Sequence, residues 1–387
     1  MSQAILSYED FIGRVGEFAK QAPTLLGRHA STADLASRVD GVAEQGEKPF
    51  TVAVVGQMRV GKSTLLNALM ERDLAITGVN ETTATLNWFR HGSREQEGFF
   101  RVIWKDLPAE DFRFELIGEW VGDSQKAART AAIEFFVDSP YLRIANLVDT
   151  PGSRSAIGSH EETINRFLSG KLEEETNKQA QRADAIIYVF GAVGHENDET
   201  LLQQFESSTR IQGSSPFNSV AVLHKWDSLN VADPRKDARR KAAVLLERMS
   251  SHVSDVIPVS APLFQAVTKF DDRFWESVSR MANETDEDDM EDLLMGPVEF
   301  VEDAASCPLD VSERKALRTT YQLPWETLTL LFKICACDGC KTGAELRQSA
   351  LKSSGIPELR SFLDLRFFNR SRAIKSFSLL ALSLIHI

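Results

Sequence analysis

The spacing of apolar residues changes near residue 50. Residues 11–22 and 35–42 carry apolar side chains at helical intervals, which predicts two helices. Beyond residue 50, short runs of Val, Ile, Leu and Ala alternate with helical stretches, and such runs suit strands buried on both faces of a parallel sheet. The predicted strands are 51–55, 144–148, 185–190, 219–223 and 256–259, and the helices are 63–70, 159–181, 197–208 and 233–252. This alternation predicts an α/β fold with a doubly wound, mostly parallel sheet, flanked by N- and C-terminal helices.

Composition narrows the class of protein. Of the 387 residues, 43% are hydrophobic, enough for a sizeable core, and the net charge of -12 argues against a nucleic-acid partner. The N-terminal stretch has no basic region followed by an apolar run, so we predict no secretory signal. No apolar stretch has the length of a membrane span. We therefore expect a cytoplasmic location, with peripheral membrane association as an open alternative.

Residues 56–63 read Gly-Gln-Met-Arg-Val-Gly-Lys-Ser, directly after a predicted strand and directly before a predicted helix. In this context the pattern predicts a phosphate-binding loop, because its backbone N–H groups and the helix N-terminus face an anion. We expect Lys62 to reach the β- and γ-phosphates of a nucleotide and the Ser63 hydroxyl to bind Mg²⁺.

Two later segments complete the predicted phosphate side. Asp149 follows the strand at 144–148, and Thr-Pro-Gly comes next. We expect its carboxylate to hold Mg²⁺ through water and the Gly152 N–H to meet the γ-phosphate. Thr83 is our first choice, and Thr82 the second, for a threonine that closes over Mg²⁺ when a nucleoside triphosphate is bound. The alternative is a threonine-rich turn before a strand.

The base side begins with His-Lys-Trp-Asp at 224–227, after the strand at 219–223. The usual guanine-reading signature is Asn or Thr, then Lys, any residue and Asp, so the histidine is a departure. The aspartate would accept hydrogen bonds from guanine N1 and the amino group, a donor pair that adenine lacks. A backbone N–H at Ser260-Ala261 would meet guanine O6. The predicted nucleotide-binding residues are Gly56, Gln57, Met58, Arg59, Val60, Gly61, Lys62, Ser63, Thr64, Gly152, His224, Lys225, Asp227, Ser260 and Ala261; Ser63, Thr83 and Asp149 are the predicted metal ligands, and Arg59, Lys62 and Thr83 the catalytic residues.

Together these motifs resemble the dynamin superfamily, especially bacterial dynamin-like proteins. The resemblance covers about residues 50–270 and rests on GQMRVGKSTLLNAL, ETTATLNWFRHG, LVDTPGS and HKWD. It implies a GTPase that binds Mg·GTP, dimerises across its nucleotide sites and remodels membranes. It also implies helical bundle elements on both sides of the GTPase domain.

Catalysis needs a charged group beyond these motifs. Ser153 stands where small GTPases resembling Ras carry a water-positioning glutamine, and serine is too short for that role. Dynamins proper carry a serine at the position of Arg59, and that serine helps to hold a monovalent cation. The related guanylate-binding proteins and atlastins carry an arginine at this position, which acts as an arginine finger in cis. We interpret Arg59 as such a finger; the alternative is a surface arginine that makes the loop basic.

We divide the chain into five segments. They are an N-terminal helical segment (1–48), the GTPase domain (49–282), an acidic linker (283–297), a helical segment that begins a stalk or bundle (298–381), and the last six residues (382–387). Those six, LSLIHI, match a translated sequencing adapter. We expect them to be an artefact and the natural chain to continue; the alternative is a chain that ends in an apolar helix.

Two patterns near the C-terminus have competing explanations. Residues 353–381 interleave arginines with phenylalanines, which is typical of a membrane-surface helix but also of a helix packed on the GTPase domain, which we favour. The spacing of Cys335, Cys337 and Cys340 lacks two C-x-x-C pairs. We interpret these residues as buried helical thiols rather than zinc ligands.

The leading functional hypothesis is a dynamin-like GTPase with a guanine nucleotide, a second copy of itself and a membrane surface as partners. One alternative is a monomeric regulatory GTPase whose helices bind a protein. Another is a scaffold that binds GTP and hardly hydrolyses it.

Overall fold

The computed structural model describes residues 49–57, 59–73, 85–151, 183–192, 216–229, 233–302, 306–371 and 373–375, together with Glu17, Gln21 and Thr24. Several predictions fall outside these residues: most of the N-terminal segment, the helices at 159–181 and 197–208, and the last six residues. Among the predicted site residues, Met58, Thr82, Thr83, Gly152 and Ser153 also lie outside.

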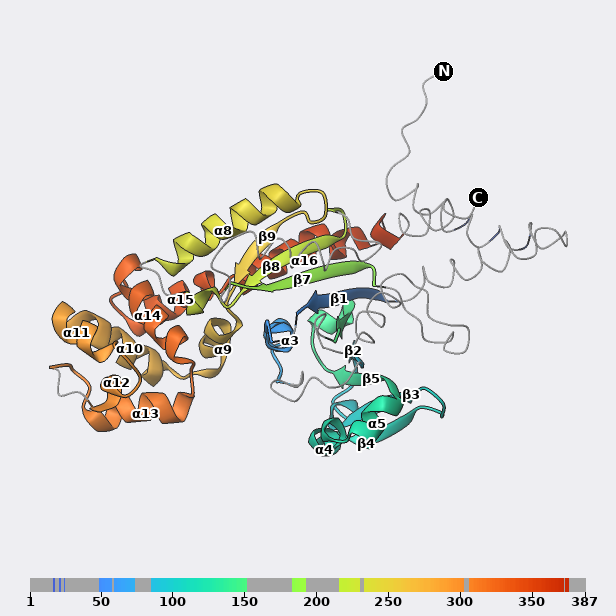
Figure 1. Ribbon diagram of the computed structural model, residues 1–387, viewed down its shortest axis with the longest axis horizontal. Coiled ribbons are helices and arrows are strands. Elements are labelled where there is room, and N and C mark those ends of the chain that lie inside the picture. The colour runs from blue at the N-terminus through green and yellow to red at the C-terminus, as the bar shows by residue number, and fades with distance from the viewer. Residues whose placement is uncertain are drawn as a thin grey trace, which may run out of the picture.

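Within the described residues, nine strands form one sheet in the order β4-β3-β5-β2-β6-β1-β7-β8-β9 (Figure 1). All five predicted strands are confirmed, as β1 (Phe50–Gly56), β6 (Ala145–Asp149), β7 (Ala185–Gly191), β8 (Ser219–His224) and β9 (Val256–Val259). They pair in parallel, which brings their carboxyl ends to one edge of the sheet. The α/β fold class is therefore confirmed.

The other half of the sheet is mixed. Its strands are β2 (Leu86–His91), β3 (Phe99–Trp104), β4 (Glu110–Arg113) and β5 (Thr130–Val137). Strand β2 pairs antiparallel with β6 and parallel with β5, and β3 pairs antiparallel with both β4 and β5. Two short helices, α4 (Ile117–Gly122) and α5 (Ser124–Arg129), follow β4.

Two hydrophobic clusters cover the sheet. One packs residues of β1 with α3 (Lys62–Met70), α9 (Ala261–Lys269) and α16 (Ile356–Arg366). The other packs the strands with α8 (Pro234–Met249) and continues into a group of later helices. The predicted helices at 63–70 and 233–252 are thus confirmed. None of the helices that the structure describes has the length and apolar character of a membrane span.

The later helices are grouped on one side of the sheet (Figure 1). They are α10 (Asp272–Glu284), α11 (Glu287–Leu293), α12 (Glu299–Glu302), α13 (Val311–Tyr321), α14 (Trp325–Asp338) and α15 (Gly343–Ser353). The acidic run that we expected to be a linker is instead mostly helical, within α10 and α11. Acidic residues favour the first turn of α11 because they face its positive end, and Leu293 at its end is fully buried.

Helix α16 returns to the sheet rather than beginning a stalk. Ile356, Leu359, Leu363 and Phe367 are fully buried against the strands. Arg360 donates hydrogen bonds from Nη2 to the Ala68 and Leu69 carbonyls at the end of α3, each 3.0 Å long. The packed-helix explanation for this arginine- and phenylalanine-rich segment is therefore confirmed for residues 356–368.

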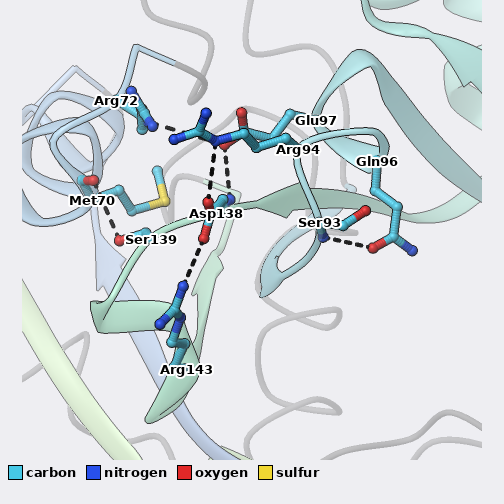
Figure 2. Close-up of polar contacts among 9 residues, drawn as sticks. All are labelled: Met70, Arg72, Ser93, Arg94, Gln96, Glu97, Asp138, Ser139 and Arg143. Carbon is cyan, nitrogen blue, oxygen red and sulfur yellow. Dashed lines mark hydrogen bonds and ion pairs between the residues drawn. The ribbon is translucent and has the colours of Figure 1, made fainter.

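A charged network joins the end of α3 to the ends of β2 and β5, at the edge of the sheet opposite the carboxyl ends of β1 and β6 (Figure 2). Asp138 lies between Arg94, at 3.7 Å, and Arg143, at 3.1 Å. Its N–H donates to Glu97 Oε1, and Glu97 also faces Arg72 at 4.0 Å. Each arginine has a carboxylate partner, so we assign this network a structural role.

Candidate active site

The loop at 56–63 connects β1 to α3, as predicted. Gly61 adopts a left-handed backbone with φ of 100° immediately before the helix, a conformation that favours glycine. Lys62 is buried, and its Nζ donates to the carbonyls of Gly56, at 3.2 Å, and Gln57, at 2.9 Å. The lysine charge is thereby held inside the loop, at the N-terminus of α3, where an anion is favoured.

Ser63, in the first turn of α3, meets Asp149 at the carboxyl end of β6. The Ser63 hydroxyl donates to Asp149 Oδ2 at 2.8 Å, although the two residues are 86 positions apart. The next residue, Thr150, ties β6 to β1, because its hydroxyl donates to the Val54 carbonyl at 2.8 Å. A hydroxyl and a carboxylate in contact form a set of hard oxygen donors, the kind that Mg²⁺ prefers. The residues present thus fit the predicted metal.

His224 lies directly beneath the loop. It ends β8, is 1% exposed, and its ring would lie 2.5 Å from a Cβ placed on Gly61. Only glycine fits at position 61 while this histidine is in place. Burial, reinforced by the charge of Lys225, lowers the pKa of His224 to about 4, so the ring is neutral near pH 7.

Lys225 links the segment at 224–227 to the loop at 56–63. Its Nζ donates to the carbonyl of Arg59 at 2.7 Å. Arg59 has a left-handed backbone with φ of 61° and an exposed side chain. A non-glycine residue in this conformation is strained by about 1–2 kcal/mol, and the hydrogen bond from Lys225 helps to hold it. Motif searching alone gives no sign of this contact.

Asp227 is in the 3₁₀ turn η6 (Trp226–Ser228), and it is 5% exposed. Its Oδ2 accepts a hydrogen bond of 2.8 Å from the Thr327 hydroxyl on α14. Its Oδ1 is buried and has no hydrogen-bond partner among the residues that the structure describes. Burial raises the pKa of Asp227, while the hydroxyls of Thr327 and Ser260 act in the opposite direction.

Ser260 and Ala261 begin α9 beside Asp227. The Ser260 side chain accepts from the Leu263 N–H and so caps the helix, and its own N–H donates to the Ser354 carbonyl at 2.9 Å. The Ala261 N–H is therefore the better candidate for guanine O6. The structure thus gathers the described members of the predicted site at one edge of the sheet: Gly56, Gln57, Arg59, Val60, Gly61, Lys62, Ser63, Thr64, Asp149, His224, Lys225, Asp227, Ser260 and Ala261.

The cysteines lie elsewhere. Cys335 and Cys340 are buried and Cys337 is exposed. Burial raises the pKa of Cys335 to about 11, which favours the protonated thiol. The buried-thiol interpretation is confirmed for Cys335 and Cys340.

Comparison with known proteins agrees with this geometry. Residues 52–226 match the model of the dynamin family. This segment therefore forms a dynamin-type domain. A domain of this type is a GTPase domain, and the match supports GTPase activity.

Among similar proteins, the isoniazid-induced protein IniC of Mycobacterium tuberculosis is 23% identical over 358 residues, covering 89% of this chain and 68% of the relative. Dynamin-like protein 2 of Campylobacter jejuni is 30% identical over 237 residues, covering 59% of this chain and 34% of the relative. A solved structure described as an oligomerised bacterial dynamin pair has a TM-score of 0.47 at 18% identity, and the match covers 72% of this chain and 45% of that one. The chain thus spans about a third to two thirds of these proteins.

Proposed function

We propose that the chain binds Mg·GTP, hydrolyses it to GDP and phosphate, and couples hydrolysis to self-association through its GTPase domain. The contact between Ser63 and Asp149 is the observation that supports this most directly. It brings the two predicted metal ligands together beside the buried Lys62 ammonium. The membrane partner is part of the proposal on the strength of the family resemblance.

In this proposal, different residues of the chain bind the phosphates and the metal ion. The loop N–H groups and Lys62 bind and orient the β- and γ-phosphates. Ser63 and Asp149, with Thr83 by resemblance, would hold Mg²⁺. When bound, Mg²⁺ neutralises charge on the phosphates. The N–H of Gly152 would donate to the γ-phosphate, as the motif implies.

Arg59 is our proposed arginine finger in cis. It stands at the exposed side of the loop, in a strained backbone conformation, and such strain is concentrated at functional positions. A guanidinium stays charged and can form two hydrogen bonds to phosphate oxygens. This would replace the monovalent cation of dynamins proper, so turnover should depend little on potassium over sodium.

The test of the whole proposal measures phosphate release and molecular mass on the same protein. We expect GTP hydrolysis in the presence of Mg²⁺, and a dimer in size-exclusion chromatography when GDP and aluminium fluoride are added. Lys62→Ala is the control, because it removes the main positive charge on the phosphates and should abolish both. A protein that hydrolyses GTP but stays monomeric in every nucleotide state would favour the regulatory switch instead.

A further inference from the structure

The guanine-reading carboxylate of Asp227 is held by a residue far outside the nucleotide motifs. Thr327 lies on α14, 100 positions after Asp227 in the chain and beyond the segment that matches the dynamin family. Both residues are buried, with Thr327 fully inaccessible. Their hydrogen bond, 2.8 Å from Oγ1 to Oδ2, joins the later helices to the base side of the site.

The two carboxylate oxygens of Asp227 differ in their surroundings. Oδ2 has the Thr327 donor, whereas Oδ1 is buried with no hydrogen-bond partner in the described part of the chain. A buried carboxylate oxygen without a donor is costly, which points to a ligand that supplies one. Guanine N1–H is such a donor. A carboxylate has about four acceptor sites, so Oδ2 can also accept the amino group of the base while it is bonded to Thr327.

Helix α14 has a second tie to the GTPase domain, at its other end. At its C-terminal end, Asp338 accepts two hydrogen bonds of 2.8 Å from the guanidinium of Arg235, at the start of α8. Helix α8 follows the base-reading segment in the chain, so Arg235 ties α14 to the same part of the GTPase domain. Helix α14 is thus tied by Asp338 at its C-terminal end and by Thr327 near its N-terminal end, which limits how far the Thr327 hydroxyl can move relative to Asp227.

We propose that Thr327 is a positioning residue for guanine recognition. Its hydroxyl fixes the carboxylate plane of Asp227 so that Oδ1 faces the base. The inference rests on the proposed function, since it assumes that Asp227 reads guanine. It adds that base selection depends on helix α14, which the nucleotide motifs do not include.

The test is a fluorescence titration of the full chain with N-methylanthraniloyl-GDP and the matching XDP probe. Thr327→Val removes the hydroxyl at nearly constant volume. We expect it to weaken GDP binding about tenfold or more, because hydrogen bonds to charged groups are among the strong ones, and to weaken the preference for guanine over xanthine. Thr327→Ser should restore both. Thr329→Val is the matched control, since the Thr329 hydroxyl on the same helix donates to the Glu326 carbonyl of its own helix, and it should match the wild type.

Asp227→Asn distinguishes a failure of the Thr327 inference from a failure of the Asp227 assignment. If it shifts binding towards XDP while Thr327→Val matches the wild type, Thr327 has no positioning role and the proposed function stands. If Asp227→Asn leaves base preference unchanged, the assignment of Asp227 itself fails. Tighter GDP binding by Thr327→Val would also overturn the inference, because the hydroxyl would then compete with the base. Thermal melts check folding, and Thr327→Ala replaces the valine variant if valine misfolds.

Discussion

Replacing His224 with asparagine should change how the stability of this protein depends on pH. The ring is buried beneath Gly61, and its pKa is lowered from 6.5 to about 4. Between these two pH values the unfolded chain takes up a proton that the folded protein refuses. Stability is therefore present above pH 6.5 and is lost as the pH falls towards 4. The full shift corresponds to about 3 kcal/mol.

The assay is urea unfolding, followed by tryptophan fluorescence, at several values between pH 7 and pH 4.5. Asparagine is one of the usual residues at this place in the guanine signature, and it does not titrate. We expect the wild type to lose about 2 kcal/mol more than His224→Asn over this range. Other titrating groups, including Asp227, are common to both proteins and cancel in the difference. If the unfolding free energies of the two proteins changed in parallel with pH, the assignment of a buried, neutral His224 with a lowered pKa would be wrong.

Three further predictions concern the loop and its support. Gly61→Ala should lose at least tenfold in GDP affinity, because φ of 100° strains alanine and its Cβ would overlap the His224 ring; near-normal binding in a titration would contradict this. Arg59→Ala should slow single-turnover hydrolysis by about 10³ or more at saturating GTP while affinity changes little; a rate within a few-fold of wild type would rule the finger out. Arg360→Ala should lower the unfolding free energy by about 1–3 kcal/mol by orphaning the carbonyls at the end of α3, and an unchanged melt would show the contact to be dispensable.

The sequence predicted well those elements that depend on residues close together in the chain. The five strands of the parallel half consist of runs that are buried along their length. The phosphate-binding loop needs glycine, lysine and serine at fixed spacing within one short segment, so the sequence alone identifies it. Its position between β1 and α3 followed from the same few residues.

The mixed half of the sheet was missed for a physical reason. Strand β4 reads Glu-Asp-Phe-Arg and lies at the exposed edge, so no apolar pattern marks it. Strand β5 contains Glu134, which is buried and forms an ion pair of 2.8 Å with Arg90 of β2. A charge inside a strand interrupts the apolar run, and only the tertiary structure supplies the partner that makes its burial tolerable.

The acidic run beyond the boundary predicted near residue 282 lies largely in helices α10 and α11, since acidic residues can cover a helix as well as a linker. The later helices bury apolar side chains against the GTPase domain. Leu359, Leu363 and Phe367 of α16 lie in the same core as β1 and α3, and burying each such side chain stabilises the fold by about 1.5–3 kcal/mol. Helix α14 meanwhile supplies the donor to Asp227. A protein ending at 282 would lose both the cover of its phosphate-loop helix and a contact at its base-reading residue. The later helices therefore share a core and a buried hydrogen bond with the segments that carry the candidate site, and this is why we propose that base recognition depends on both.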